Sequence, residues 1–279
     1  MTESFQTLRP LLFAIAYRML GSAAEAEDIL QDAWVRYQAA SPIELESEKA
    51  WLSTVVTRLC LDRLKSAQRT REEYVGPWLP EPIRTEERVD PDSISLAFLV
   101  LLERLSPLER AAYLLHEVFD YSHAEIASVL GKEEAAVRQL FHRAAAHVRE
   151  GKPRYSPTRA DHERLLSGFL QALTTGDLAA LQGLLADDAT LTADSGGKVR
   201  AAARHELHGA RVVSLFIAGL VRKFPPGPEH TFEIVDVNGW PALVARTSGI
   251  VSAVISIETD GTHILAIRNV VNPEKLARV

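Results

Sequence analysis

Four polar residues near the middle of the chain have the side chains that proteins use to read DNA. They recur at helical spacing on one face of a helix expected from about residue 133 to 149: Arg138, Gln139, His142 and Arg143. Arginine can donate two hydrogen bonds to guanine, glutamine can pair with adenine, and a second arginine can hold a phosphate. The pattern predicts a base-reading helix, and an ordinary solvated polar face remains the alternative.

The elements expected to position these side chains form a helix-turn-helix. Ser122 and Glu125 have the spacing of a capping box that begins a short helix, and Gly131 ends it. A longer helix follows, and its expected buried face carries Val137, Leu140, Phe141, Ala144 and Val148. In this motif the second helix enters the major groove of DNA. Capped helix pairs are common, so spacing alone leaves DNA binding open.

A second group of residues has the composition of a surface for melted DNA. It lies on a helix expected from about Trp51 to Gln68 and comprises Trp51, Arg58, Arg63, Lys65 and Arg69. Basic side chains next to an aromatic ring suit single-stranded DNA, whose exposed bases can stack. The alternative is a solvated helix face with Trp51 in the core.

An acidic helix face precedes this group. Ser22 and Glu25 predict the start of a helix whose outer face carries Glu25, Asp28, Gln31 and Asp32. This face would repel DNA phosphates, but it could bind a basic partner surface, where charge complementarity sets association rate and specificity. A merely solvated face is again the alternative.

Length and composition limit the class of protein. The chain has 279 residues and a net charge of −6. The net charge alone disfavours nucleic-acid binding, but local clusters of basic residues can still bind a polyanion. Cys60 is the single cysteine, so no internal disulfide can form, and its apolar surroundings predict a core position. We find no secretory signal and no apolar run of about 20 residues. We therefore expect a cytoplasmic protein without cofactor or metal.

Proline and glycine divide the chain. Three prolines between Gly76 and Pro82 exclude a helix there, and Gly151-Lys152-Pro153 makes a second break. We expect domains at 1–75, 93–151 and 158–279, with a linker at 76–92. The last domain has helical periodicity first and then short strands at 232–237, 242–247, 250–258 and 264–271, with hairpin turns at Asn238-Gly239 and Asp260-Gly261. This order predicts an α+β fold with an antiparallel meander.

Several segments resemble the extracytoplasmic-function (ECF) sigma factors. Residues 24–34, 50–52 and 58–64 look like region two of that family, and residues 105–110 and 121–149 look like region four. The resemblance implies a multidomain protein whose two all-α sigma domains are a region two helical bundle and a region four helix-turn-helix. It also implies that the acidic helix docks on the β′ coiled coil of RNA polymerase. The helix 51–69 would then open and read the −10 promoter element, and the helix 133–149 would read the −35 element.

Three further segments resemble signatures of the SigJ-type subgroup, which carries a fused SnoaL-like extension. They are residues 76–82, 194–198 and 272–276, and Ser195 replaces one glycine of the usual second signature. The resemblance implies an α+β NTF2-like cone. We expect its regulatory contacts at Trp78, Leu79, Pro80, Asp194, Gly196, Gly197, Lys198, Asn272, Pro273 and Lys275.

Two roles for the extension remain open. It could be a built-in regulator that packs on the sigma domains or their linker, in which case no separate anti-sigma factor is expected and the protein is not an enzyme. Alternatively it could be a small-molecule sensor or a SnoaL-like isomerase or cyclase with a pocket carboxylate as general base. The candidates for that chemistry are Asp187, Asp188, Asp194, His205 and His208.

Overall fold

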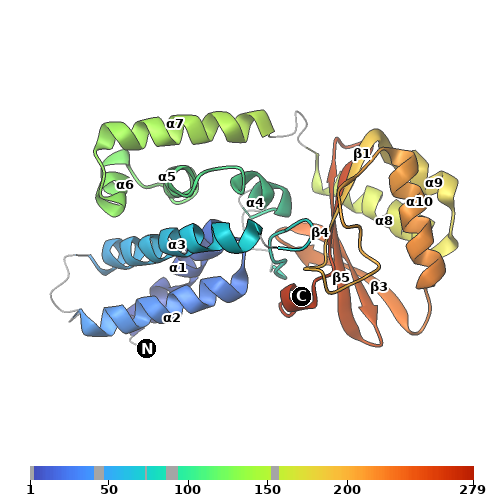
Figure 1. The fold of residues 1–279 in the computed structure, drawn as a ribbon, viewed down its shortest axis with the longest axis horizontal. Helices are drawn as coiled ribbons and strands as arrows, with labels where there is room; N and C mark the ends of the chain where they lie inside the picture. Colours follow the sequence, from blue (N-terminus) through green and yellow to red (C-terminus); the bar gives the residue numbers. More distant parts are fainter. Residues whose placement is uncertain (1–2, 41–46, 73, 86–93, 152–156) are drawn as a thin grey trace. The chain divides into compact units, whose positions relative to one another are not determined.

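The computed structural model describes residues 3–40, 47–72, 74–85, 94–151 and 157–279 (Figure 1). The chain forms two compact units. The first contains Met1–Glu72 and Leu99–Lys152, and the second contains Glu73–Phe98 and Pro153–Val279. The described part of the expected linker, residues 76–85, therefore belongs to the C-terminal unit, and residues 86–92 lie outside the described residues.

Three long helices begin the first unit. They are α1 (Glu3–Leu20), α2 (Ala23–Ala39) and α3 (Glu48–Glu72). Gly21, with a φ of 68°, ends α1, and the Ser22 side chain accepts the Glu25 N–H to cap α2. Most apolar residues along these helices are buried in a common core, and Cys60 lies in that core as expected. Burial raises the pKa of the Cys60 thiol, which keeps the sulfur protonated and unreactive.

Four further helices complete the all-helical part. They are α4 (Leu96–Leu102), α5 (Pro107–Glu117), α6 (His123–Leu130) and α7 (Glu134–Gly151). Complete capping boxes begin α5 at Ser106 and α6 at Ser122, and Gly131 ends α6 with a φ of 63°. The expected helix pair is therefore confirmed as α6 and α7.

The second unit places helices against a sheet (Figure 1). The helices are α8 (Arg159–Thr175), α9 (Leu178–Leu184) and α10 (Ala210–Lys223). The strands are β1 (Leu185–Asp194), β2 (Leu207–His208), β3 (His230–Val237), β4 (Trp240–Thr247), β5 (Ile250–Thr259) and β6 (Ile264–Val270). A short 3-10 turn, Pro273–Lys275, follows β6. This is the predicted α+β NTF2-like fold.

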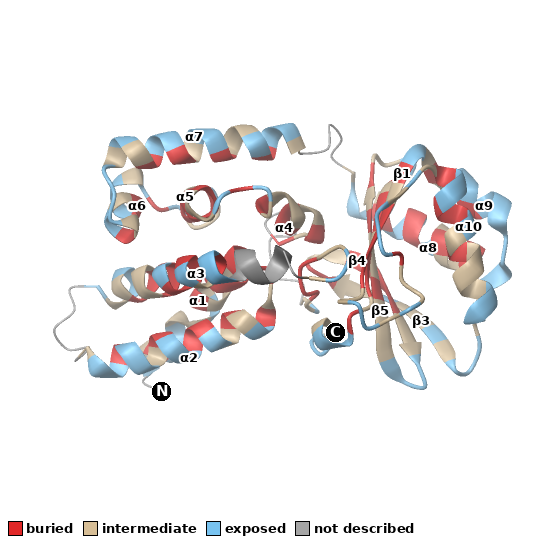
Figure 2. Ribbon diagram, in the orientation of Figure 1, coloured by how far each residue is buried: buried red, intermediate tan, exposed pale blue. Residues whose placement is uncertain are grey.

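The sheet differs from the predicted meander at one edge. Its strand order is β2-β1-β6-β5-β4-β3, and β3 to β6 form the expected antiparallel meander. Strand β1 lies outside the predicted meander, and it pairs parallel with β6. Buried residues gather where the helices face the sheet (Figure 2), and Phe169, Leu191 and Ile267 are at most 2% exposed there.

Candidate functional site

The predicted base-reading residues all lie exposed on α7. Arg138, Gln139, His142 and Arg143 face solvent, and Val137, Leu140, Ala144 and Val148 are buried on the opposite face. The amphipathic pattern therefore leaves a polar surface of the composition expected for a base-reading helix.

Two acidic side chains orient the arginines of this surface. Arg138 is paired with Glu134 one turn earlier, and Arg143 Nε donates to Glu109 Oε1 at 2.8 Å. Burial opposes ionisation of Glu109, but hydrogen bonds from Arg143 and Ser106 outweigh burial and hold the pKa of this carboxyl below its ordinary value. A charged Glu109 thus links the cap of α5 to the surface of α7.

The predicted −10 residues lie on or next to contacts within the first unit. Arg58 donates from Nε to the Val129 carbonyl at 2.9 Å and from Nη2 to the Ser128 carbonyl at 3.3 Å. A buried hydrogen bond of 2.7 Å from the Tyr121 hydroxyl to Ser53 Oγ joins the same two segments. Helix α3 is therefore held against α6 through the side chain expected to read DNA.

The other members of the −10 group are placed differently. Trp51 is half-buried, and the centroid of its ring lies 6.2 Å from that of Tyr37. The indole ring is therefore only partly exposed for stacking on a DNA base. Lys65 is exposed and pairs with Asp62, and Arg63 lies 3.9 Å from Glu25. The side chain of Arg69 lies outside the described residues.

The predicted polymerase-docking face of α2 is exposed. Asp28, Gln31 and Asp32 face solvent, and Glu25 is half-buried next to Arg63. Val35 continues this face and is 63% exposed. The face therefore offers carboxylates with one apolar neighbour, which suits a basic partner surface.

In the second unit, a buried carboxylate holds the linker. Asp194 is fully buried at the end of β1 and receives hydrogen bonds from the Tyr74 hydroxyl at 2.5 Å, the Leu79 N–H at 2.8 Å, Lys275 Nζ at 2.7 Å and the Gly196 N–H at 3.1 Å. A buried charge needs such partners, because desolvation without them costs several kcal/mol. We call Tyr74, Leu79, Asp194, Asn272 and Lys275 the linker clamp.

Lys275 and Asn272 close the linker clamp from the C-terminal tail. Lys275 Nζ also donates to the Leu79 carbonyl at 2.6 Å and lies 4.2 Å from the centre of the Trp78 ring, within cation–π distance. Asn272 Nδ2 donates to the Tyr74 hydroxyl at 2.9 Å. Burial and the bond to Asp194 raise the pKa of Tyr74. The three signature segments, residues 76–82, 194–198 and 272–276, thus meet at the carboxylate of Asp194.

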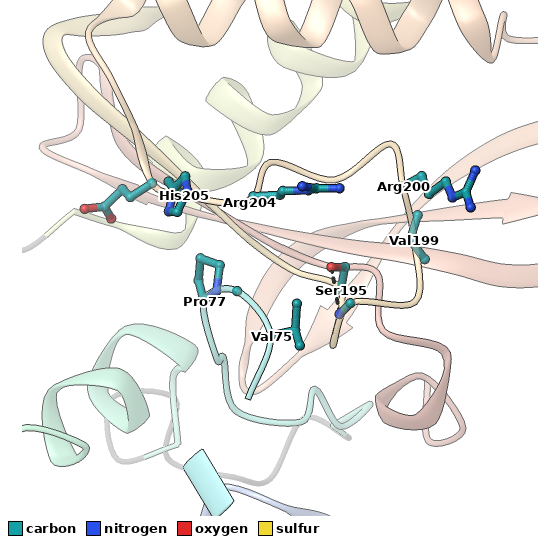
Figure 3. Close-up of a pocket in the computed structure, with 10 residues that line it drawn as sticks. Val75, Pro77, Ser195, Val199, Arg200, Arg204 and His205 are labelled. Atoms are coloured by element: carbon teal, nitrogen blue, oxygen red, sulfur yellow. Dashed lines mark hydrogen bonds between the residues drawn. The ribbon is translucent and has the colours of Figure 1, made fainter. Parts of the chain in front are cut away.

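The glycine turn after β1 fits the linker closely. Gly196 and Gly197 have φ values of 55° and 74°, and a Cβ on Gly196 would lie 2.6 Å from Asn272 Nδ2. Ser195 is not among the residues with positive φ, so its replacement of glycine carries no backbone strain. Val75 and Pro77 lie across from Ser195 (Figure 3), and Lys198 pairs with Glu274 at the exposed rim.

A second anchor holds the linker at the β3–β4 turn. Asn238 donates its N–H to the Ile83 carbonyl at 2.9 Å, and its side chain accepts the Ile83 N–H and donates to the Ile94 carbonyl at 3.1 Å. The hairpin signal Asn238-Gly239 predicted the turn but not this contact. Tyr74 and Asn238 were not predicted as site residues, because neither belongs to the local signature runs.

The second unit also contains two hollows. A cleft of about 630 Å³ is lined by Val75, Gly197, Arg200, Arg204 and His205 among others (Figure 3). An apolar cavity of about 450 Å³ lies inside the cone. No carboxylate is found among the described residues that line the cavity.

The acid–base candidates of the enzyme hypothesis do not meet in that cavity. Asp187, Asp188 and His208 are exposed, and His205 lines the cleft. Asp194 is the buried member of the set, and its oxygens face the linker clamp.

Comparison with known proteins decides the family. The model of sigma-70 region 2 matches residues 5–70, and that of sigma-70 region 4 matches residues 95–148. The ECF RNA polymerase sigma factor SigJ of Mycobacterium tuberculosis is 38% identical, over 98% of this chain and 92% of its own length. This chain belongs to the ECF RNA polymerase sigma factors. A probable ECF sigma factor, SigI of the same organism, is 30% identical over 99% of this chain and 94% of its own.

The fold of this sigma factor agrees with a solved relative. The crystal structure of Mycobacterium tuberculosis SigJ superposes with a TM-score of 0.76 and 34% sequence identity. The match covers 98% of this chain and 96% of the crystallised SigJ chain. As a sigma factor, the chain is a transcription regulator that binds the RNA polymerase core and promoter DNA. Among its described helices none is both long and apolar enough to cross a membrane.

Proposed function

We propose that this sigma factor reads promoters through α3 and α7 and that its C-terminal unit regulates the reading by holding the linker. The single observation that carries the regulatory part is the linker clamp, in which buried Asp194 binds the Leu79 N–H and Lys275 Nζ. Residues 1–75 act as region two, 93–151 as region four and 158–279 as the regulatory domain, and residues 76–92 connect the first two.

The contacts with promoter DNA and with the polymerase are each made by the exposed face of one helix. The exposed residues of α7, from Arg138 to Arg143, read the −35 element, and the basic residues of α3 read the −10 element. The acidic face of α2 docks on the β′ coiled coil of the polymerase. Because the Arg58 guanidinium donates to two carbonyls of α6, α3 and α6 must separate before Arg58 can contact DNA.

The regulatory domain acts within its own chain. A tethered partner is present at an effective concentration in the millimolar range, so even a weak contact with the linker is occupied. The linker clamp therefore performs in one chain what a separate anti-sigma factor would do, and we expect no such factor and a cytoplasmic location. The cavity presents no carboxylate among its described lining residues, which favours a regulator over an isomerase or cyclase.

Transcription from genomic DNA tests promoter reading. Purified chain and core polymerase should give discrete start sites in a run-off assay followed by RNA sequencing. The substitution Gln139→Ala should weaken transcription from those sites by about 5- to 150-fold, since a good base contact is worth about 1–3 kcal/mol. The matched change Gln171→Ala, on the exposed face of α8, should leave them unchanged. Equal output from both variants would contradict the assignment of α7.

A further inference from the structure

The apolar cavity of the cone has the size and lining of a small-molecule site. Its volume of about 450 Å³ falls within the range of about 300–1,000 Å³ that is usual for such sites. Side chains of α8, α10 and the strands make most of the wall, among them Phe169, Leu173, Ile217, Phe232 and Ile255. Phe224 and Ile250 also line it and are 40% and 74% exposed, so apolar side chains contribute to its opening to solvent.

One polar atom in this apolar wall has no partner. Asn269 of β6 is 8% exposed, and its Oδ1 is buried without a hydrogen bond among the described residues. Ile267 and Val271, two positions away on either side, line the cavity as Asn269 does, which is the alternation of one strand face. A buried unsatisfied acceptor costs about 1–3 kcal/mol. A ligand that donates a hydrogen bond would remove this cost.

The charges around the cavity favour a neutral ligand over an ionic one. Arg246 is the one guanidinium among the described lining residues, and it is already paired with Glu233, at 3.0 Å from Nε and 2.7 Å from Nη2. His230 lies 3.3 Å from the Thr247 hydroxyl. With the positive charge compensated and no carboxylate in the described wall, a neutral ligand fits best.

The floor of the cavity is continuous with the linker clamp. Pro273 and Leu276 line the cavity, and Lys275 lies between them in the chain. Because Leu276 is part of the cavity lining, a molecule that fills the cavity at this end would contact it. Lys275 Nζ in the same turn bonds Asp194 and the Leu79 carbonyl, so the turn physically connects the cavity lining to the linker clamp.

We propose that the cavity binds a neutral, mainly apolar small molecule whose hydroxyl or N–H group donates to Asn269 Oδ1, and that this ligand tightens the linker clamp. The second half of the proposal rests on the regulatory function proposed above. The ligand would order the turn from Pro273 to Leu276 and thereby make release of the linker depend on a metabolite of this chemical class.

A matched pair of probes tests the binding site on the full-length chain. 4-Phenylphenol carries a hydroxyl donor, and 4-methylbiphenyl has nearly the same shape without one. In titration calorimetry 4-phenylphenol should bind about tenfold more tightly, the ratio that corresponds to 1.4 kcal/mol. Asn269→Leu should abolish this preference and keep the binding of 4-methylbiphenyl.

Two further variants keep the test independent of Asn269. Ala253→Phe places a ring in the cavity and should abolish binding of both probes, and Ala179→Phe, on the exposed surface of α9, should change neither. Binding of neither probe to the wild-type chain would overturn the site. Equal binding to the wild type and to a folded Ala253→Phe chain would do so as well, and equal affinity of the two probes would overturn the role of Asn269.

Hydrogen exchange separates this proposal from the function on which it rests. The Leu79 amide proton, which bonds Asp194, should exchange more slowly when 4-phenylphenol is bound. If the probe binds and the exchange rate of Leu79 is unchanged, the coupling is wrong and the cavity remains a binding site. The linker clamp itself is tested without any ligand by the lysine variants described below.

Discussion

At the scale of single residues, the charge of Asp194 is the most informative feature. A fully buried carboxylate is stable only with strong partners, and here Lys275 and three further donors supply them. Each partner comes from residues 74–79, the glycine turn or the C-terminal tail, so one charge depends on all three segments being in place. The free energy of the linker clamp should therefore be sensitive to single substitutions.

Lysine substitutions distinguish this buried pair from an exposed one. Lys275→Met leaves Asp194 buried without its cation and should destabilise the C-terminal unit by about 3 kcal/mol. Lys198→Met removes the cation of an exposed pair with Glu274 and should cost at most about 1 kcal/mol. Urea unfolding, followed by tryptophan fluorescence, measures both midpoints. Equal midpoints for the two variants would show that the buried charge of Lys275 contributes no more to the stability of the C-terminal unit than the exposed charge of Lys198 does.

Glycine substitutions test the close approach of the turn to the tail. Gly196→Ala requires a positive φ and a Cβ 2.6 Å from Asn272 Nδ2, so it should destabilise the unit by at least about 1–2 kcal/mol. Gly219→Ala, inside α10 with no heavy atom within 4 Å of its Cβ, should stabilise it by about 0.5–1 kcal/mol. Thermal unfolding followed by circular dichroism measures the two shifts, whose opposite signs are the prediction.

Much of this residue-scale description could be predicted from the sequence. The helical spacing of the apolar residues and the helix caps place Arg138 and Arg143 on the solvent side of α7, because a helix with one apolar stripe leaves the opposite face exposed. The partner of Arg143, Glu109, lies 34 positions away on α5, and Tyr74 lies 120 positions from Asp194. Such pairs depend on how elements pack, and no local pattern encodes them.

At the scale of elements, the packing of α8 on β4 buries an imidazole. The ring of His162 on α8 packs against that of Trp240 in a tilted arrangement, with the ring centroids 4.4 Å apart, and its Nδ1 is without a partner among the described residues. Burial lowers the pKa of His162, although Asp161 and Glu258 act in the opposite direction. The folded chain therefore takes up a proton at lower pH than the unfolded chain does.

This shift predicts how the stability of the C-terminal unit depends on pH. Because the unfolded state binds the proton first, stability rises with pH near the ordinary histidine value of about 6.5 and is lost as pH falls below it. Thermal unfolding between pH 5.5 and 7.5 should show this loss in the wild type and a flatter profile in His162→Phe. Parallel profiles for the two chains would mean that another group causes the pH dependence.

The elements themselves were predictable to different degrees. The strands from β3 to β6 follow alternating apolar positions and two hairpin turns, and both signals are local. Strand β1 carries exposed Asp187 and Asp188 in its first half, and their sequence pattern places them at a helix end before a strand. Its parallel pairing with β6 joins segments more than 70 residues apart, which no hairpin rule predicts.

At the scale of the whole molecule, the linker belongs to a different unit from the sigma regions that it connects. Residues 74–85 are bound to the C-terminal unit at Asp194 and at Asn238, while α3 and α7 belong to the first unit. Because these linker residues are bound to the C-terminal unit, they cannot extend freely. Regions two and four are therefore restricted in how they adjust to promoters whose −10 and −35 elements are differently spaced. The linker clamp should therefore restrict the distance between the −10 and −35 elements that the sigma factor accepts.

The most direct test of this central claim is run-off transcription on a series of promoters that differ only in spacer length. A promoter recovered with the wild-type chain serves as the parent, and the spacer is changed one base pair at a time. The wild-type chain and Lys223→Met, an exposed lysine of α10, should show the same narrow optimum, and Lys275→Met should transcribe a broader range of spacers. An identical narrow optimum for Lys275→Met and the wild type would contradict the account.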